Sequence, residues 1–235
     1  AGLGGAQQAV ICRTGKGGLA ALAGSLASLG IPVEVAGDEI ALGEQACVLV
    51  LLDAMGTVLD LAEGRAPERQ RLARVLDSPL SGLDPSSIRL LGRTLWSAQE
   101  HTSSRTAGEL VLDRLAALAG EPNPAASDGA GAGNPSVRHP ARNHPGDPRL
   151  EALIRLGRLL GEAADDLRKG RSGYDVVWRL WAGTDWPQRL YADALSTGTT
   201  ATAANKDLDA ICALFDLASR HVELTGVRGL RSLIA

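Results

Sequence analysis

Apolar residues recur at helical spacing through most of the chain from residue 44 onward, and this pattern restricts the fold more than any other feature of the sequence. In residues 44–62 apolar residues dominate, so we expect a helix that is buried on much of its surface. Asp84 and Pro85 are typical of an N-cap and a first helical position, and they predict the start of another helix. The other predicted helices cover residues 67–78, 108–120, 149–170, 174–184, 185–196 and 205–226.

Strand signals are confined to the first part of the chain. Residues 8–13 form a short apolar run, and residues 31–36 are rich in β-branched side chains. Between them, residues 18–29 repeat Leu and Ala at helical spacing. This order predicts a β-α-β unit, and because an isolated parallel pair normally belongs to a wider sheet, we interpret the unit as a fragment of an α/β domain. The predicted fold class is therefore mainly α, with a small β-α-β fragment in front.

Residues 121–148 have no apolar period and are dense in Pro, Gly, Asn and Asp. Because such a composition cannot offset the entropy lost on ordering, we predict a flexible loop that a protease cuts first. The spacing of His139 and His144 in this loop, with no carboxylate or Cys partner, is a weak metal-site signal, and we interpret both as solvated residues. The predicted divisions are residues 1–37, 38–120, 121–148 and 149–235.

The formal net charge of −3 excludes a protein that is basic over its whole surface. A contact with nucleic acid would therefore need a local basic patch. Trp178, Trp181 and Trp186 lie close together in the sequence and predict a packed aromatic cluster. The alternative is a platform on which bases stack.

Cys12, Cys47 and Cys212 each lie in an apolar run, which is typical of buried thiols in a reducing cytoplasm. Their number and spacing predict neither a disulfide framework nor a zinc site. No apolar stretch reaches the roughly 18 residues that a membrane span requires. The sequence thus predicts a cytoplasmic protein without a membrane partner.

Residues 13–18 (Arg-Thr-Gly-Lys-Gly-Gly) lie between a predicted strand and a predicted helix, where a phosphate-binding loop would lie. A P-loop requires Gly-x-x-x-x-Gly-Lys-Ser/Thr, whose hydroxyl holds Mg²⁺. Here Val10 takes the first glycine position and Gly17 follows Lys16. We therefore expect no ATP hydrolysis, although a backbone site for an anion stays open. No pair of nucleophile and base stands out, so no catalytic residue is assigned.

Four stretches, in this order, resemble the UvrD/Rep/PcrA family of superfamily 1 DNA helicases. Residues 8–39 resemble the strand, Arg-Thr/Ser and helix at which the family's second motor domain leaves its sheet. Residues 44–60 resemble the helix that follows, and residues 71–95 resemble the opening of the inserted subdomain called 2B. Residues 177–224 look closer to the AdnA/AdnB helicase–nuclease branch. The resemblance implies a helical insertion subdomain preceded by a small β-α-β fragment of an α/β motor domain.

In this family the 2B subdomain contacts duplex DNA ahead of the motor and regulates unwinding, so the resemblance implies a regulatory part of an ATP-dependent helicase in DNA repair or recombination. The family's duplex contact matches Ser81-Gly82-Leu83, and Arg13-Thr14 matches a motor-domain motif. A glycine lets the backbone approach a phosphate, and a helix N-terminus supplies free N–H groups. Asp84, however, stands where the family has a second glycine, and an ordinary helix-capping turn is the alternative.

The family's motifs for ATP, for Mg²⁺ and for the arginine finger have no counterpart in this sequence. The resemblance therefore implies no cofactor in this segment, with ATP and Mg²⁺ bound elsewhere in a longer parent protein. It also implies a junction of double-stranded and single-stranded DNA as ligand, and a partner subunit in a helicase–nuclease heterodimer. The alternative from another class is a helical scaffold for protein–protein interaction without DNA binding. An independent enzyme that uses residues 13–18 is disfavoured.

Overall fold

The computed structural model describes residues 25–26, 29, 41–98, 105–121 and 146–234. The chain divides into two compact units, Ala1–Leu42 and Gly43–Ala235. In the first unit, Ser25 and Leu26 are helical, within the segment predicted as a helix. The two predicted strands lie outside the described residues, as do Arg13, Thr14 and Lys16, and the predicted β-α-β fragment stays a prediction. Most of the predicted flexible loop, residues 122–145, also lies outside them.

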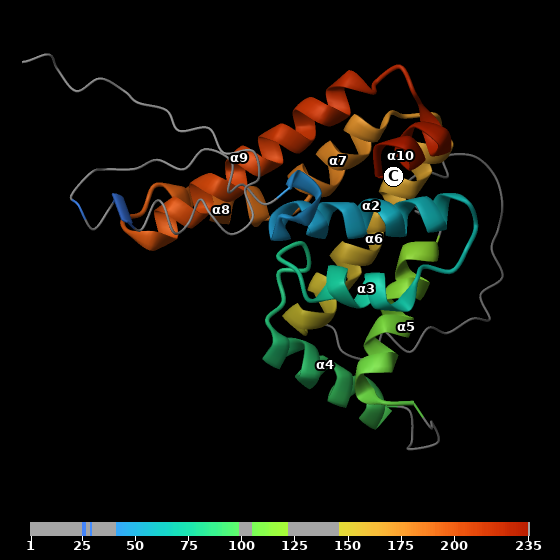
Figure 1. Cartoon of the computed structure of the whole chain (residues 1–235). Helices are drawn as coiled ribbons and strands as arrows, with labels where there is room; N and C mark the ends of the chain where they lie inside the picture. The colour runs from blue at the N-terminus through green and yellow to red at the C-terminus, as the bar shows by residue number, and fades with distance from the viewer. Residues whose placement is uncertain (1–24, 27–28, 30–40, 99–104, 122–145, 235) are drawn as a thin grey trace, which may run out of the picture. The chain divides into compact units, whose positions relative to one another are not determined.

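The described part of the second unit is helical, which confirms a mainly α protein (Figure 1). None of the described helices is long and apolar enough to cross a membrane. In chain order the elements are η1 (Leu42–Glu44, a 3-10 helix), α2 (Ala46–Ala62), α3 (Arg69–Leu76), α4 (Pro85–Ala98), α5 (Ala107–Gly120), α6 (Pro148–Arg168), α7 (Gly173–Ala182), α8 (Trp186–Ala194), α9 (Thr199–Arg220) and α10 (Gly226–Ile234).

Helix α2 lies at the centre of the second unit and packs against α3, α6, α7, α9 and α10. Leu51, Met55 and Val58 are fully buried, and burial extends round most of the helix. The predicted burial of residues 44–62 on much of their surface is thus confirmed. Thr57 is the polar exception, and its hydroxyl donates to the carbonyl oxygen of Asp53 at 2.9 Å, so the buried oxygen keeps a partner.

Helix α6 begins and ends at local signals. The carboxylate of Asp147 accepts a hydrogen bond from the amide of Arg149 at 2.9 Å, and Pro148 occupies the first helical position. After the last turn, Gly170 adopts a φ of +82°, the left-handed conformation that ends many helices. Because these signals depend only on neighbouring residues, the bounds of α6 match the predicted helix at 149–170 closely.

Helices α5 and α6 cross so closely that two glycines are needed on α6. A Cβ added at Gly157 would lie 2.5 Å from the Cβ of Leu118, and one added at Gly161 would lie 2.8 Å from the carbonyl oxygen of Ala119. This contact joins the helices before the predicted flexible loop to those after it. Both sets therefore belong to one compact unit.

The C-terminal helices depart from prediction at two places. Helix α9 begins at Thr199 rather than at residue 205, following Gly198 with a φ of +81°. The helix predicted over 205–226 ends earlier, at Arg220, and α10 was not predicted; glycine is a poor helix former, and α10 contains Gly226 and Gly229. Gly229 is required by packing: a Cβ there would lie 1.7 Å from the carbonyl oxygen of Leu224.

Candidate functional site

The turn predicted to contact DNA lies between α3 and α4. Gly82 is exposed and has a φ of +67°, a conformation that residues other than glycine rarely adopt. A Cβ built at Gly82 meets nothing within 4 Å, so the backbone is open to approach from outside. By contrast Ser81 is buried, and Leu83 is half-buried. Of the three predicted site residues, Gly82 alone is exposed.

Two buried hydroxyls hold the turn. The Ser78 hydroxyl donates to the carbonyl oxygen of Val75 at 2.7 Å, and the Ser81 hydroxyl donates to the carbonyl oxygen of Ser78 at 3.1 Å. The amide of Leu83 in turn donates to the Ser81 hydroxyl at 3.0 Å. The conformation is therefore fixed by the turn's own hydrogen bonds and needs no ligand.

The same network uses the amides that a phosphate would need. The Ser81 amide donates to the Ser78 carbonyl oxygen at 3.2 Å, and the Gly82 amide donates to the Pro79 carbonyl oxygen at 3.3 Å. With the Leu83 amide on Ser81, all three predicted contact residues donate their N–H groups inside the turn. Any phosphate at Gly82 would therefore need a donor from another part of the protein.

Asp84 caps α4, as predicted. Its carboxylate accepts hydrogen bonds from the amides of Ser86 at 2.8 Å and Ser87 at 3.0 Å. Hydrogen bonds from the hydroxyls and amides of these two serines hold the pKa of Asp84 well below its usual range. An ionised carboxylate thus occupies the anion position at this helix N-terminus, and it would repel a phosphate placed there.

A donor beside the turn comes from α8, far along the chain. The Nη2 atom of Arg189 donates to the carbonyl oxygen of Pro79 at 2.7 Å. A guanidinium has five N–H donors, so most of them stay available to an anion next to Gly82. Sequence reasoning missed Arg189 because 110 residues separate it from Pro79 and no motif marks it.

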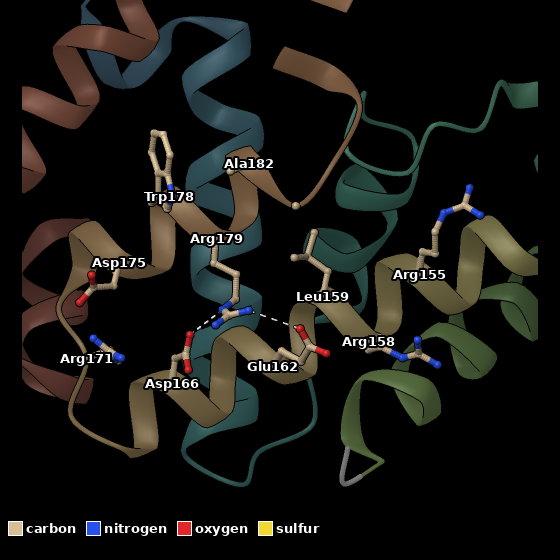
Figure 2. Close-up of a pocket in the computed structure, with 11 residues that line it drawn as sticks. Arg155, Arg158, Leu159, Glu162, Asp166, Arg171, Asp175, Trp178, Arg179 and Ala182 are labelled. Atoms are coloured by element: carbon tan, nitrogen blue, oxygen red, sulfur yellow. Dashed lines mark hydrogen bonds and ion pairs between the residues drawn. The ribbon is translucent and has the colours of Figure 1, made fainter. Parts of the chain in front are cut away.

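A second feature, also absent from the sequence predictions, is a groove of about 600 Å³ between α6 and α7 (Figure 2). Figure 2 shows Arg179 reaching from α7 to α6, where its guanidinium lies 2.5 Å from Asp166 and 3.4 Å from Glu162. The Asp175 carboxylate accepts hydrogen bonds from the amide and hydroxyl of Ser172, as the cap of α7. The groove's three carboxylates are thus all engaged.

Three other arginines of the groove, Arg155, Arg158 and Arg171, are exposed. No carboxylate of the described residues forms an ion pair with any of them. The groove therefore carries three guanidinium groups that have no ion-pair partner among the described residues.

The predicted tryptophan cluster is confirmed for two of its members. Trp181 and Trp186 are 9% and 6% exposed, and their rings meet edge to face at 5.0 Å. The prediction is wrong for Trp178, which is 54% exposed. The buried side of α7 includes Val177, Leu180 and Trp181, so position 178 falls on the outer side. There its ring lies edge to face with that of Phe215, with 5.9 Å between the ring centroids.

The cysteine prediction also holds only in part. Cys47 is buried, and burial, with Asp207 nearby, raises the pKa of its thiol to about 11. Cys212 is exposed, because Ile211 and Leu214 take the buried positions on that part of α9. Cys12 lies outside the described residues. Within the described residues, no three His, Cys, Asp or Glu side chains gather as a metal site would need.

Comparison with known proteins adds no assignment: no protein-family model matches the chain, and no curated protein matches it.

Proposed function

We propose that this chain is a regulatory, duplex-DNA-contacting subdomain of an ATP-dependent DNA helicase that acts in DNA repair or recombination. The subdomain would correspond to the 2B insertion of UvrD/Rep-type helicases, which four stretches of the sequence resemble in order. It would have no catalytic role of its own. In this proposal ATP and Mg²⁺ bind to motor domains of the parent protein, and the helicase–nuclease partner would be a second subunit.

The observation that carries the proposal is the open turn at Gly82 with Arg189 beside it. The exposed glycine allows a sugar–phosphate backbone to come close, since no side chain stands in the way. Arg189, fixed by its hydrogen bond to Pro79, supplies the donors that the turn's amides do not. A guanidinium suits a phosphate because it can bind two oxygens at once.

Such a contact has a defined signature. It involves the DNA backbone and not the base edges, so its affinity should not depend on DNA sequence. It should weaken as salt rises, because binding a phosphate releases condensed counterions. Asp84 limits the strength of the contact, since its ionised carboxylate lies two residues from Gly82.

The test uses the parent helicase with a Gly82→Val substitution and, as a matched control, Gly64→Val. Gly64 lies in the turn after α2 with a φ of +71°, and a Cβ there also meets nothing within 4 Å. Both variants carry the same backbone strain, which thermal unfolding measures. Only Gly82→Val should weaken duplex binding and unwinding. Equal DNA binding by the two variants would contradict the duplex contact.

Arg189→Gln tests the guanidinium separately. It should reduce duplex affinity and lower the slope of log affinity against log salt by about 0.9, the value for one phosphate contact. Arg220→Gln is the control, because Arg220 is an exposed arginine on α9 that pairs with Asp216. An unchanged salt slope in Arg189→Gln would remove Arg189 from the contact.

A helical scaffold without DNA binding is the second candidate, and one observation favours it. Tyr191 and Leu195 lie four residues apart at the end of α8 and are 62% and 68% exposed, an apolar pair of the kind that protein partners cover. If Gly82→Val and Arg189→Gln both leave DNA binding intact, while Tyr191→Ser with Leu195→Ser abolishes subunit association, the scaffold is the better assignment.

A further inference from the structure

From the α6–α7 groove we infer a second nucleic-acid contact: it binds an unpaired strand, with phosphates at Arg155, Arg158 and Arg171 and a base against Trp178. This goes beyond the proposed duplex contact, because it concerns another surface and another form of DNA. It does not depend on the turn at Gly82. The argument has three parts: the charge of the groove, its length and the exposed aromatic ring.

The charge of the groove selects a polyanion. Four arginines and three carboxylates line the groove, which gives its lining a formal net charge of +1. Arg179 lies between Glu162 and Asp166 and pairs with both, and the Asp175 carboxylate accepts hydrogen bonds from the cap of α7. Within the part of the chain that the structure describes, the other three arginines form no ion pair, which leaves their guanidinium groups to bind phosphate. In a chain with a net charge of −3, this groove is a local basic patch of the kind that nucleic-acid binding would require.

The arginines are spaced along the groove as a strand would need. Arg155 and Arg158 lie three residues apart on the outer face of α6, and Arg171 lies just beyond the end of that helix. From Arg155 to Arg168, at 1.5 Å per residue, α6 rises about 20 Å. At the stacked spacing of about 3.4 Å per nucleotide this rise corresponds to roughly six nucleotides, and to fewer in a more extended strand. A single phosphate group or a mononucleotide could not reach both ends.

Trp178 supplies the feature that favours unpaired bases. Trp178 is one of the residues that line the groove, and its ring projects from α7 away from the side on which Arg179 reaches α6 (Figure 2). Phe215 supports it edge to face at 5.9 Å, and Phe215 also contacts Tyr174 at 5.6 Å, so the exposed ring rests on an aromatic cluster. A stacked base pair in a duplex does not offer its face, whereas an unpaired base does.

The experiment measures binding of the full chain to a fluorescent oligothymidylate of about 12 nucleotides, a length within the usual range for such grooves, by fluorescence anisotropy. Trp178→Ala should weaken binding about fivefold or more, whereas Trp178→Phe, which keeps a stacking ring, should stay within about twofold. Because the side chain is more than half exposed, both variants should fold, and far-ultraviolet circular dichroism checks that they do.

The charge test compares two double variants that lower the net charge equally. Arg155→Gln with Arg158→Gln should weaken binding and lower the salt slope by about 1.4, the value for two single-strand phosphates. Arg89→Gln with Arg93→Gln is the control, since these α4 arginines are also exposed, four residues apart and without an acidic partner among the described residues. It should leave the affinity for the oligothymidylate unchanged.

Three outcomes would overturn the inference. An equal loss in both double variants would mean that affinity follows net charge alone. Equal affinity for polyglutamate of the same charge would mean that the groove selects no base. Equal affinity for a duplex of the same length, with the same loss in Trp178→Ala, would remove the preference for unpaired bases. The duplex contact is judged separately, because Gly82→Val is tested on duplex DNA and should leave the oligothymidylate affinity intact.

Discussion

The α5–α6 crossing gives a sharp test of the fold, because alanine should destabilise it even though alanine is the better helix former. A Cβ at Gly157 would lie 2.5 Å from the Leu118 Cβ, and one at Gly161 would lie 2.8 Å from the Ala119 carbonyl oxygen. Packed carbon atoms are about 3.5–4.0 Å apart, so the helices would have to separate by roughly 1 Å. Both obstacles belong to or adjoin the backbone, so no change of rotamer relieves them.

The expected magnitude follows from two opposing effects. Each Gly→Ala substitution gains about 1 kcal/mol in helix propensity. Each overpacked site costs about 1–3 kcal/mol. For Gly157→Ala with Gly161→Ala, the free energy of unfolding should therefore fall by about 2 kcal/mol, the middle of the range that these terms give. In a unit of this size that loss lowers Tm by about 4–8 °C.

Urea and thermal unfolding, followed by circular dichroism at the helical band, measure the change. Gly108→Ala is the matched control, because Gly108 lies in the first turn of α5 and a Cβ there meets nothing within 4 Å. It should leave stability unchanged or raise it by up to about 1 kcal/mol. If the double variant were as stable as Gly108→Ala, α5 and α6 could not cross as closely as the structure has them.

Three other predictions concern single side chains. The pKa of Asp84 is lower in the folded protein than in the unfolded chain, so Asp84 should stabilise the fold above its unfolded pKa of about 4 and lose this effect as the pH falls further. The difference in Tm between the wild type and Asp84→Asn should therefore shrink in acid. In a Cys12→Ser variant at pH 8, a disulfide reagent should modify the exposed Cys212 rapidly and Cys47 only on unfolding. Cys47 should react slowly because its pKa of about 11 keeps the thiol protonated. Trp181→Ala should cost about 3–5 kcal/mol in urea unfolding, because a buried ring is lost.

The features that sequence predicted well are those determined by neighbouring residues. Asp84 and Pro85 predicted the start of α4, since an N-cap needs only the side chain and the amides two or three residues on. Asp147 and Gly170 mark the ends of α6 in the same way. The positive φ of Gly82, which would make substitution costly, could be anticipated from a glycine in a short turn but not established without the backbone conformation.

It was harder to predict which side chains of a helix face the core than where the helix begins and ends. Trp178 and Cys212 both lie in apolar helical segments, and each is exposed because residues next to it take the buried positions. A helix turns by about 100° per residue, so an error of one position moves a side chain from the core to solvent. In α10 the difficulty was different, because glycine disfavours a helix on propensity, whereas the close approach of Gly229 to Leu224 is known only from the folded backbone.

The candidate sites could be predicted least, because they depend on contacts between distant segments. Arg189 reaches Pro79 across 110 residues, and Arg179 reaches Asp166 from the next helix. The sequence contains the groove's arginines, but it does not show which of them have acidic partners. The groove is a candidate site because of that distinction, since a guanidinium already paired with a carboxylate attracts a phosphate much less than an unpaired one.

The two proposed contacts would let a chain with a net charge of −3 bind DNA through local groups of charge. At the turn, the amides are used internally and Asp84 is ionised, so one guanidinium, that of Arg189, has to carry the attraction. In the groove, pairing of Arg179 with Asp166 removes an acid that would otherwise repel a phosphate. The charges close to a site, and not the net charge of the chain, decide where an anion binds, because charges more than about 8–10 Å apart are largely screened at ordinary salt concentrations. In the proposal, the duplex and the unpaired strand are therefore each bound through arginines that lack an acidic partner among the described residues.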